Sequence, residues 1–193
     1  MSEWGPKTES VNAEGEADGF MPPTAFYGEL AGEGMTRLVI SVPLESLSRV
    51  HEALIAELTP PLGFLYRRKV NRLDPKPSGS PPDDYVGLEL APTRVVAALR
   101  ESKGVIYHDG RSEIWVRGAM QAQIILDEDG VLYTYPDDPG FREVLVRHGL
   151  TEAPVRTLAD VDYPKRWFHG VHDAAEERLI DNLNLTLMPP QKT

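Results

Sequence analysis

The 193-residue sequence contains no cysteine, which excludes disulfide bonds, thiolate nucleophiles and zinc sites with cysteine ligands. Its apolar runs fall far short of the ~20 residues that a membrane-spanning helix needs. The first ten residues, MSEWGPKTES, lack the basic and apolar regions of a signal peptide. From these absences we predict a cytoplasmic protein that does not associate with membranes.

The sequence also lacks the short motifs that mark many catalytic and cofactor sites. The nucleophile motif G-x-S-x-G, the P-loop and the dinucleotide-binding pattern G-x-G-x-x-G are all absent. His169 and His172 form the only close histidine pair, and their spacing is looser than that of helical zinc motifs. The acidic run 127–129 lacks the ligand order of a calcium loop. We therefore predict no catalytic residues, no cofactor and no functional transition metal.

Acidic residues are concentrated near the N-terminus. The net charge of the chain is −10, and residues 1–34 contain seven acidic residues and one lysine. This segment shows no helical or strand periodicity, so we predict a disordered acidic tail over 1–34. Its apolar pairs, Phe20-Met21 and Phe26-Tyr27, favour either a motif that docks on a partner or a segment that folds back onto its own domain. The acidic balance argues against nucleic-acid binding, because phosphates repel it.

Residues 35–193 read as a single α+β domain. From Thr36 to Tyr107 the patterns follow the order strand, helix, strand, strand, helix, strand, over 36–42, 43–58, 64–70, 85–90, 92–103 and 105–107. This βαββαβ order is typical of the ferredoxin-like fold, in which two crossover helices cover one face of an antiparallel sheet. The sequence therefore predicts a ferredoxin-like unit at the centre of the domain.

Two β-hairpins are predicted to extend this sheet. Asp109-Gly110 is a strong turn signal between 105–107 and 114–116, and residues 128–130 join 122–127 to 131–135. A helix is predicted from Asp138 to Gly149. Residues 183–187 alternate like a strand, whereas Asp173 favours a helix that continues through Leu183, and the sequence leaves both alternatives open. The result is a mostly antiparallel sheet with C-terminal helices.

A basic cluster interrupts the predicted strand 64–70 and is the sharpest charge anomaly in this acidic chain. It consists of Arg67, Arg68, Lys69 and Arg72. Guanidinium groups bind phosphates and carboxylates, so one hypothesis is an anion-binding or partner-binding site. The alternatives are protection of an edge strand from aggregation and binding of the protein's own acidic tail.

Four aromatic residues recur at positions that neighbouring strands bring together: Tyr107, Trp115, Tyr133 and Tyr135. Tyr133 and Tyr135 share a face, because they are two positions apart on a strand. We predict that the four form one partner-binding patch. The alternative is that they pack in the core beneath the C-terminal helix.

These patterns favour a small interaction protein without catalytic activity, such as an adaptor, inhibitor or immunity-type binder with a protein partner. The main alternative is an enzyme or small-ligand binder whose polar groups come from scattered strands and loops. A third hypothesis is an anion or nucleic-acid binder that uses the basic cluster, which the net charge disfavours.

Overall fold

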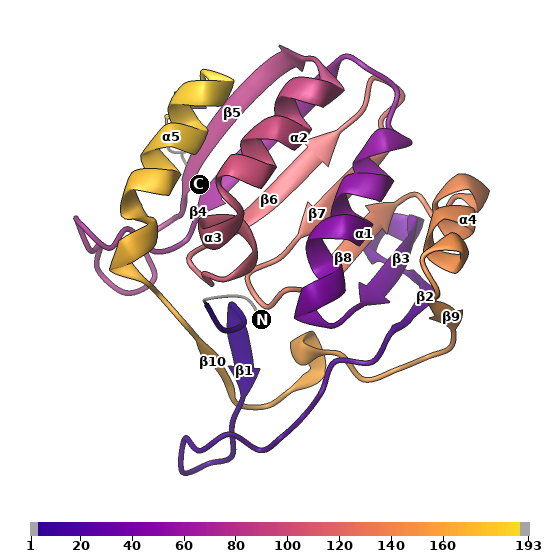
Figure 1. Ribbon diagram of the computed structural model, residues 1–193, viewed down its shortest axis with the longest axis horizontal. Coiled ribbons are helices and arrows are strands. Elements are labelled where there is room, and N and C mark those ends of the chain that lie inside the picture. Colours follow the sequence, from indigo (N-terminus) through magenta and orange to yellow (C-terminus); the bar gives the residue numbers. More distant parts are fainter. Residues whose placement is uncertain (1–3, 190–193) are drawn as a thin grey trace.

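A computed structural model describes residues 4–189, which form a nine-stranded sheet and a separate two-stranded sheet (Figure 1). The large sheet has the strand order β11-β5-β4-β6-β7-β8-β3-β2-β9. All its neighbouring strands are antiparallel except β2 and β9. Its strands are β2 (Ala25–Leu30), β3 (Thr36–Ser41), β4 (Leu62–Arg68), β5 (Asp83–Leu90), β6 (Ser112–Arg117), β7 (Gln123–Leu126), β8 (Leu132–Tyr135), β9 (Thr151–Glu152) and β11 (Thr186–Leu187). The small sheet pairs β1 (Thr8–Ser10) with β10 (Pro164–Arg166).

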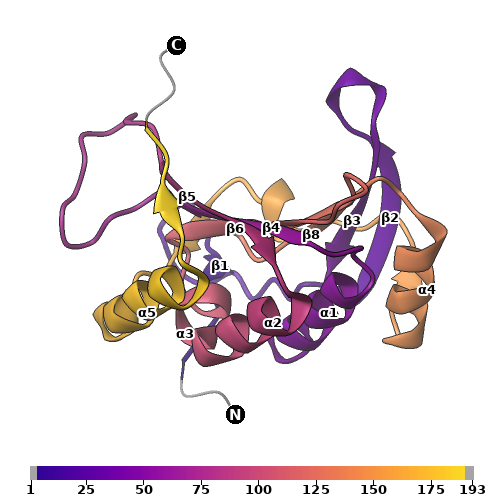
Figure 2. The ribbon, with the colours of Figure 1, turned by 90° about the horizontal axis from the view of Figure 1, so that it is seen from above.

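Within the described residues, all five α-helices lie on one side of the large sheet (Figure 2). They are α1 (Leu44–Ala56), α2 (Pro92–Glu101), α3 (Lys103–Tyr107), α4 (Pro139–Arg147) and α5 (Asp173–Leu183). Three short 3₁₀ helices are η1 (Gly32–Gly34), η2 (Leu158–Asp160) and η3 (Gly170–His172). None of the helices in this part of the chain combines the length and apolar character needed to cross a bilayer.

The main core lies between the helices and the sheet face that they cover. The helix α1 illustrates how the sequence builds it: Leu47, Val50 and Leu54 recur at intervals of three or four and are at most 3% exposed. On the strands, every second side chain faces this core, as with Ile114 and Val116 of β6. The alternate side chains of each strand therefore point to the opposite face of the sheet.

The prediction of an α+β fold with a mostly antiparallel sheet is confirmed, but the ferredoxin-like unit is not. In that unit the first strand lies beside the third and the fourth. Here β3 pairs with β2 and β8, and four strands separate it from β5. The strands β6, β7 and β8 lie between β4 and β3, so the strand pairing differs from that of the ferredoxin-like unit.

The predicted strand 105–107 is wrong, because these residues form the helix α3. Val105, Ile106 and Tyr107 are all at most 2% exposed, and a short run of buried apolar residues fits a helix as well as a strand. A Cβ atom on Gly104 would lie 2.5 Å from the His172 ring, so this glycine permits close packing and does not end the helix. The hairpin predicted at Asp109-Gly110 is consequently also absent.

The second predicted hairpin is confirmed as β7 and β8. The Asp127 carboxylate accepts hydrogen bonds from the backbone N–H groups of Asp129 and Val131 at 3.0 and 2.8 Å, and Gly130 adopts a φ of +86° that favours glycine. The alternatives for 183–187 are both realised in succession. The helix α5 ends at Leu183, Asn184 takes a left-handed conformation (φ 51°), and β11 begins at Thr186.

The prediction of a disordered tail is wrong for the described part of 1–34. The strand β2 pairs along its whole length with β3, and Phe26 is 1% exposed. The strand β1 pairs with β10, and Lys7 beside it is 2% exposed. The pair Phe26-Tyr27 therefore marks a segment that folds back onto the protein, which was one of the two alternatives for it.

Candidate functional site

The sheet face opposite the helices carries three of the four aromatic residues predicted to bind a partner. Trp115 on β6 and Tyr133 and Tyr135 on β8 alternate with buried residues that face the helices, so the three share the other side of the sheet. Each is half-buried. We call this side the open face and define it by Tyr27, Val39, Leu65, Val86, Trp115, Arg117, Ile125, Tyr133 and Tyr135.

Tyr107 lies on the helical side, so the predicted patch of four aromatic residues does not form. It is 2% exposed, and its hydroxyl lies 3.1 Å from Nδ1 of His51 in α1. Burial raises the pKa of the Tyr107 hydroxyl above its ordinary value. Tyr107 is thus a core residue, which was the alternative considered for this group.

Strand register aligns the open face into a continuous row. Directly opposed residues follow one another across β5, β4, β6, β7, β8, β3 and β2 in the order Val86, Leu65, Trp115, Ile125, Tyr133, Val39 and Tyr27. Opposed side chains on neighbouring strands lie close enough to contact one another. The row is therefore one apolar and aromatic band that crosses most of the sheet.

The two ends of this band differ in how they are covered. Near β3 and β8, Leu158 and Val161 from the η2 segment pack with Val39 and Tyr133 in a small second hydrophobic cluster. At the other end, Val86, Leu65 and Trp115 belong to neither hydrophobic cluster of the described residues. The neighbouring Leu88 on β5 is 70% exposed. Among the described residues, no hydrophobic segment packs over the end of the band at β4, β5 and β6, which we call its uncovered end.

Charged side chains surround Trp115. The Arg67 guanidinium lies 5.1 Å from the centre of the indole ring, which is a cation–π contact. The indole N–H donates to Glu113 at 3.1 Å. Arg117, two positions along β6 on the same face, is exposed and makes no side-chain hydrogen bond or ion pair with another described residue. A free cation therefore lies next to an anchored aromatic ring.

A second cation holds the tyrosines in place. The Arg37 guanidinium lies 4.6 Å from the centre of the Tyr133 ring and donates to the Tyr135 hydroxyl at 2.9 Å. It also donates to the Glu29 carboxylate from Nε at 2.7 Å. These contacts fix the two rings on the sheet, so this part of the open face is preorganised.

The predicted anion-binding cluster is fully paired with carboxylates of the protein itself. The ion pairs are Arg67–Asp84 at 2.9 Å, Arg68–Asp83 at 3.0 Å, Lys69–Glu128 at 2.6 Å and Arg72–Asp173 at 3.3 Å. An added anion would have to compete with each of these carboxylates. The edge-protection interpretation is wrong, because β4 lies between β5 and β6 and is not an edge strand.

Sequence reasoning missed a buried ionic network centred on Arg111. This residue is 0% exposed and binds Asp109 through two hydrogen bonds of 3.0 and 2.8 Å. It also donates to Asp173 at 2.7 Å and to Glu176 at 3.1 Å, both on α5. Glu176 accepts a further hydrogen bond of 2.5 Å from the Tyr66 hydroxyl of β4. The network joins α5 to the sheet, and no local signal marks it, because its α5 partners lie 62 and 65 positions from Arg111.

The histidines near the network pack as aromatic rings. His169 and His172 meet edge to face with their ring centres 5.5 Å apart, and Trp4 packs against His172 at 4.7 Å. Over residues 4–189, no group of three or more His, Asp or Glu side chains is arranged to hold a metal ion.

The fold and the open face define an α+β protein whose sheet is covered by helices on one side and only in part on the other. No protein-family model, no curated protein and no solved structure matches the chain.

Proposed function

We propose that the protein is a cytoplasmic interaction module, an adaptor, inhibitor or immunity-type binder, that holds a protein partner on the open face at Trp115. The uncovered end of the apolar band carries this proposal. There Val86, Leu65 and Trp115 lie side by side in register and outside both hydrophobic clusters. Contiguous apolar surface with a polar surround is typical of protein-binding sites.

The residue types on this surface also support a protein-binding site. Tryptophan, tyrosine and arginine are the residues most enriched among the energetically dominant positions of protein interfaces. Trp115 is held by Arg67 and Glu113, so little side-chain freedom remains to be lost on binding. Arg117 has a charge that no other described residue neutralises. The partner that fits presents an apolar side chain to Trp115 and Leu65 and a carboxylate to Arg117.

Site-specific photo-crosslinking tests where the partner binds. A photoreactive amino acid in place of Leu88, which is 70% exposed beside the apolar band, is expected to capture the partner in cells. The same group in place of Val146, which is 61% exposed on α4, is the matched control and is expected to capture nothing specific. Adding Arg117→Glu to the Leu88 variant is expected to abolish the crosslink. No product at position 88, or equal products at 88 and 146, would contradict the proposal.

Affinity measurements with the captured partner then test the contributions of Trp115 and Arg117 to binding. Truncating a central aromatic anchor costs about 2 kcal/mol, so Trp115→Ala is expected to weaken binding roughly thirtyfold. Arg117→Glu is expected to weaken binding most at low salt and to leave the melting temperature unchanged, because the side chain is exposed and unpaired. Tyr163→Ala, which removes a 58% exposed ring outside the open face, serves as the control. Unchanged affinity in both test variants would refute this binding mode.

A further inference from the structure

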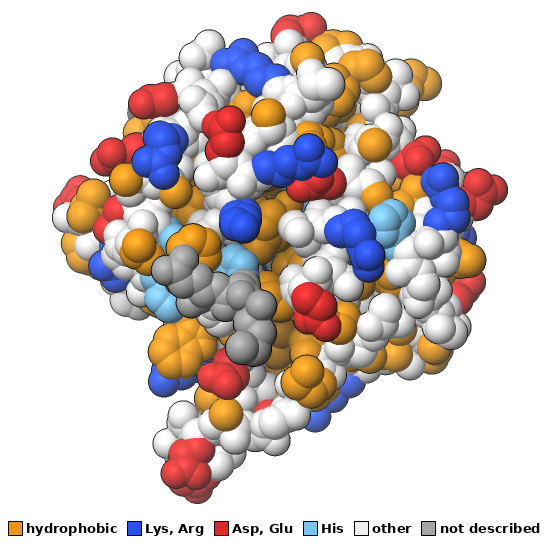
Figure 3. Space-filling view, in the orientation of Figure 1, with side chains coloured by type: hydrophobic (Ala, Val, Ile, Leu, Met, Phe, Trp, Pro, Cys, Tyr) orange, Lys and Arg blue, Asp and Glu red, His pale blue; other side chains and the backbone are white. Residues whose placement is uncertain are grey.

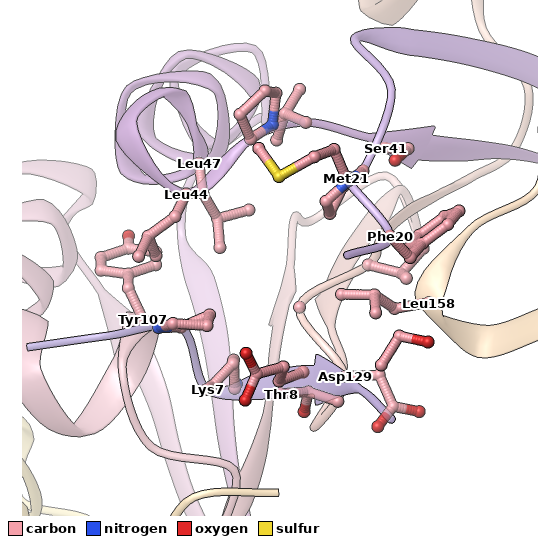
Figure 4. Close-up of a pocket in the computed structure, with 18 of the residues that line it drawn as sticks. Lys7, Thr8, Phe20, Met21, Ser41, Leu44, Leu47, Tyr107, Asp129 and Leu158 are labelled. Carbon is pink, nitrogen blue, oxygen red and sulfur yellow. The ribbon is translucent and has the colours of Figure 1, made fainter. Parts of the chain in front are cut away.

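A cavity of about 270 Å³ lies where the N-terminal segment crosses the start of α1 (Figure 4). Leu44 and Leu47 of α1 lie on one side of it, Leu158 on the other, and Lys7 and Thr8 along a third. Figure 3 shows a hollow with hydrophobic side chains in its floor between the start of α1 and β1. An apolar cavity of about 150 Å³ holds a benzene molecule, so this one has room for a ring with a short side chain.

The walls of the cavity are mainly apolar. Phe20 and Met21 come from the N-terminal segment, Val42 follows β3, Leu47 lies in α1, and Val131 directly precedes β8. Met21 is 76% exposed and lies at the outer side, whereas Leu47 and Val131 are at most 3% exposed. The cavity thus has a buried apolar interior and an accessible rim.

Lys7 is the only basic residue among the described residues that line the cavity, and its charge points away from the cavity. The Lys7 ammonium donates to the backbone oxygens of Asp127 at 2.9 Å and Ser112 at 3.3 Å. The neighbouring Thr8 hydroxyl is also engaged, since it donates to the backbone oxygen of Glu128 at 2.8 Å. These groups hold the N-terminal segment in place and are not available to a ligand.

Three polar side chains of the lining remain without a partner. Glu9 of β1 and Glu45 of α1 make no ion pair and no side-chain hydrogen bond with another described residue. Ser41 at the end of β3 is 3% exposed, and its hydroxyl has no hydrogen-bond partner among the described residues. The cavity therefore offers two free carboxylates and one free hydroxyl around an apolar interior.

We propose that the cavity binds a small organic cation, a primary amine on a single-ring or short aliphatic body. The apolar part fills the space between Phe20, Leu47 and Leu158. The ammonium group lies at the rim, where the Glu9 and Glu45 carboxylates compensate its charge. This site adjoins the covered end of the open face, where Leu158 packs with Val39 and Tyr133, but it does not include Trp115 and does not depend on the binding of a protein partner there.

Three phenyl compounds that differ in charge test the proposal: 2-phenylethylamine, 2-phenylethanol and 3-phenylpropanoate. The protein carries five methionines, and among those that the structure describes, Met21 lies in the cavity wall, so labelling the methionine methyl groups with carbon-13 gives a reporter there. Saturable shifts of the Met21 methyl signal are expected with the amine, while the signals of Met35 and Met120 stay in place. The amine is expected to bind at least about tenfold more tightly than the carboxylate, because only the amine matches the charge of the rim.

Substitutions then assign the charge recognition to particular residues. Glu9→Gln and Glu45→Gln are each expected to weaken amine binding by about two- to fivefold and to leave binding of the neutral alcohol unchanged. Glu14→Gln removes an exposed acid of the same segment that does not line the cavity and is the matched control. Absence of a Met21 shift up to the solubility limit would overturn the proposal. Equal affinity for the three compounds, or an equal effect of Glu14→Gln, would overturn it as well.

Discussion

Acid is expected to destabilise this protein through one buried histidine. His51 lies on the inner face of α1, is 0% exposed, and bonds only through Nδ1, to the Tyr107 hydroxyl at 3.1 Å. Burial lowers the pKa of His51 from 6.5 to about 3, and the nearby Lys7 charge contributes in the same direction. In the unfolded chain the same imidazole takes up a proton at its ordinary pKa. Between the two pKa values, the unfolded state therefore binds one proton more than the folded state.

The sign and size of the effect follow from this difference. The stabilising contribution is complete above pH 6.5 and is lost as the pH falls from 6.5 towards about 3. Each pH unit within that window removes about 1.4 kcal/mol from the free energy of unfolding, so about 2 kcal/mol is lost by pH 5. For a chain of this size the loss corresponds to a fall in melting temperature of about 4–8 °C.

Comparison with His51→Asn separates this effect from the titration of the carboxylates. Asparagine keeps a polar atom near the position of Nδ1 and does not titrate, whereas the carboxylates titrate alike in both proteins. Urea unfolding at pH 7.5 and pH 5.0 is expected to show that the variant loses about 2 kcal/mol less than the wild type over this interval. His148→Asn, at the half-exposed C-cap of α4, is the control. Equal acid losses in wild type and His51→Asn would refute the reasoning.

Two further predictions concern the attachment of distant segments. Arg111→Met is expected to lower the free energy of unfolding by about 3–5 kcal/mol, because it leaves the fully buried Asp109 carboxylate without its counter-charge. Urea unfolding should show partial recovery when Asp109→Leu is added, and no recovery would contradict this explanation. Gly110→Ala places a Cβ atom 2.9 Å from the Lys7 carbonyl oxygen, so we expect faster amide exchange in residues 4–22 with little change in α1. Unchanged exchange would show that the close approach is not needed to hold the N-terminal segment.

Sequence patterns predicted well those elements whose signal is local. The helix α1 follows from the spacing of Leu47, Val50 and Leu54, and the β7–β8 turn follows from the chemistry of Asp127 and Gly130. The run 105–107 had no such signal, because three consecutive buried apolar residues suit either kind of element. What decides it is packing against α5 and the His172 ring, which local patterns do not contain.

The same distinction applies to the open face. Strand alternation places Tyr133 and Tyr135 on one side, and this much follows from the sequence. That Trp115 joins them depends on the pairing of β6 with β7 and of β7 with β8, which sets Trp115 opposite Ile125 and Ile125 opposite Tyr133. The register of neighbouring strands is set only when the sheet assembles. The apolar band across the sheet therefore could not be predicted from the individual strands.

The acidic charge of the N-terminal segment led to the wrong prediction of a disordered tail. Its seven acids predicted a solvated tail, and the basic cluster of Arg67, Arg68, Lys69 and Arg72 offered it a binding site. In the structure this cluster is paired with other acids, and the segment is held by the pairing of β1 and β2 and by the hydrogen bonds of Lys7. Burial lowers the pKa of Lys7 to about 8, and the carboxylates of Asp127 and Glu128 oppose that shift, so the ammonium form still prevails at neutral pH. Glu9, on the neighbouring strand β1, lines the cavity and makes no ion pair with another described residue. The ordered segment thus carries a free negative charge on the cavity wall.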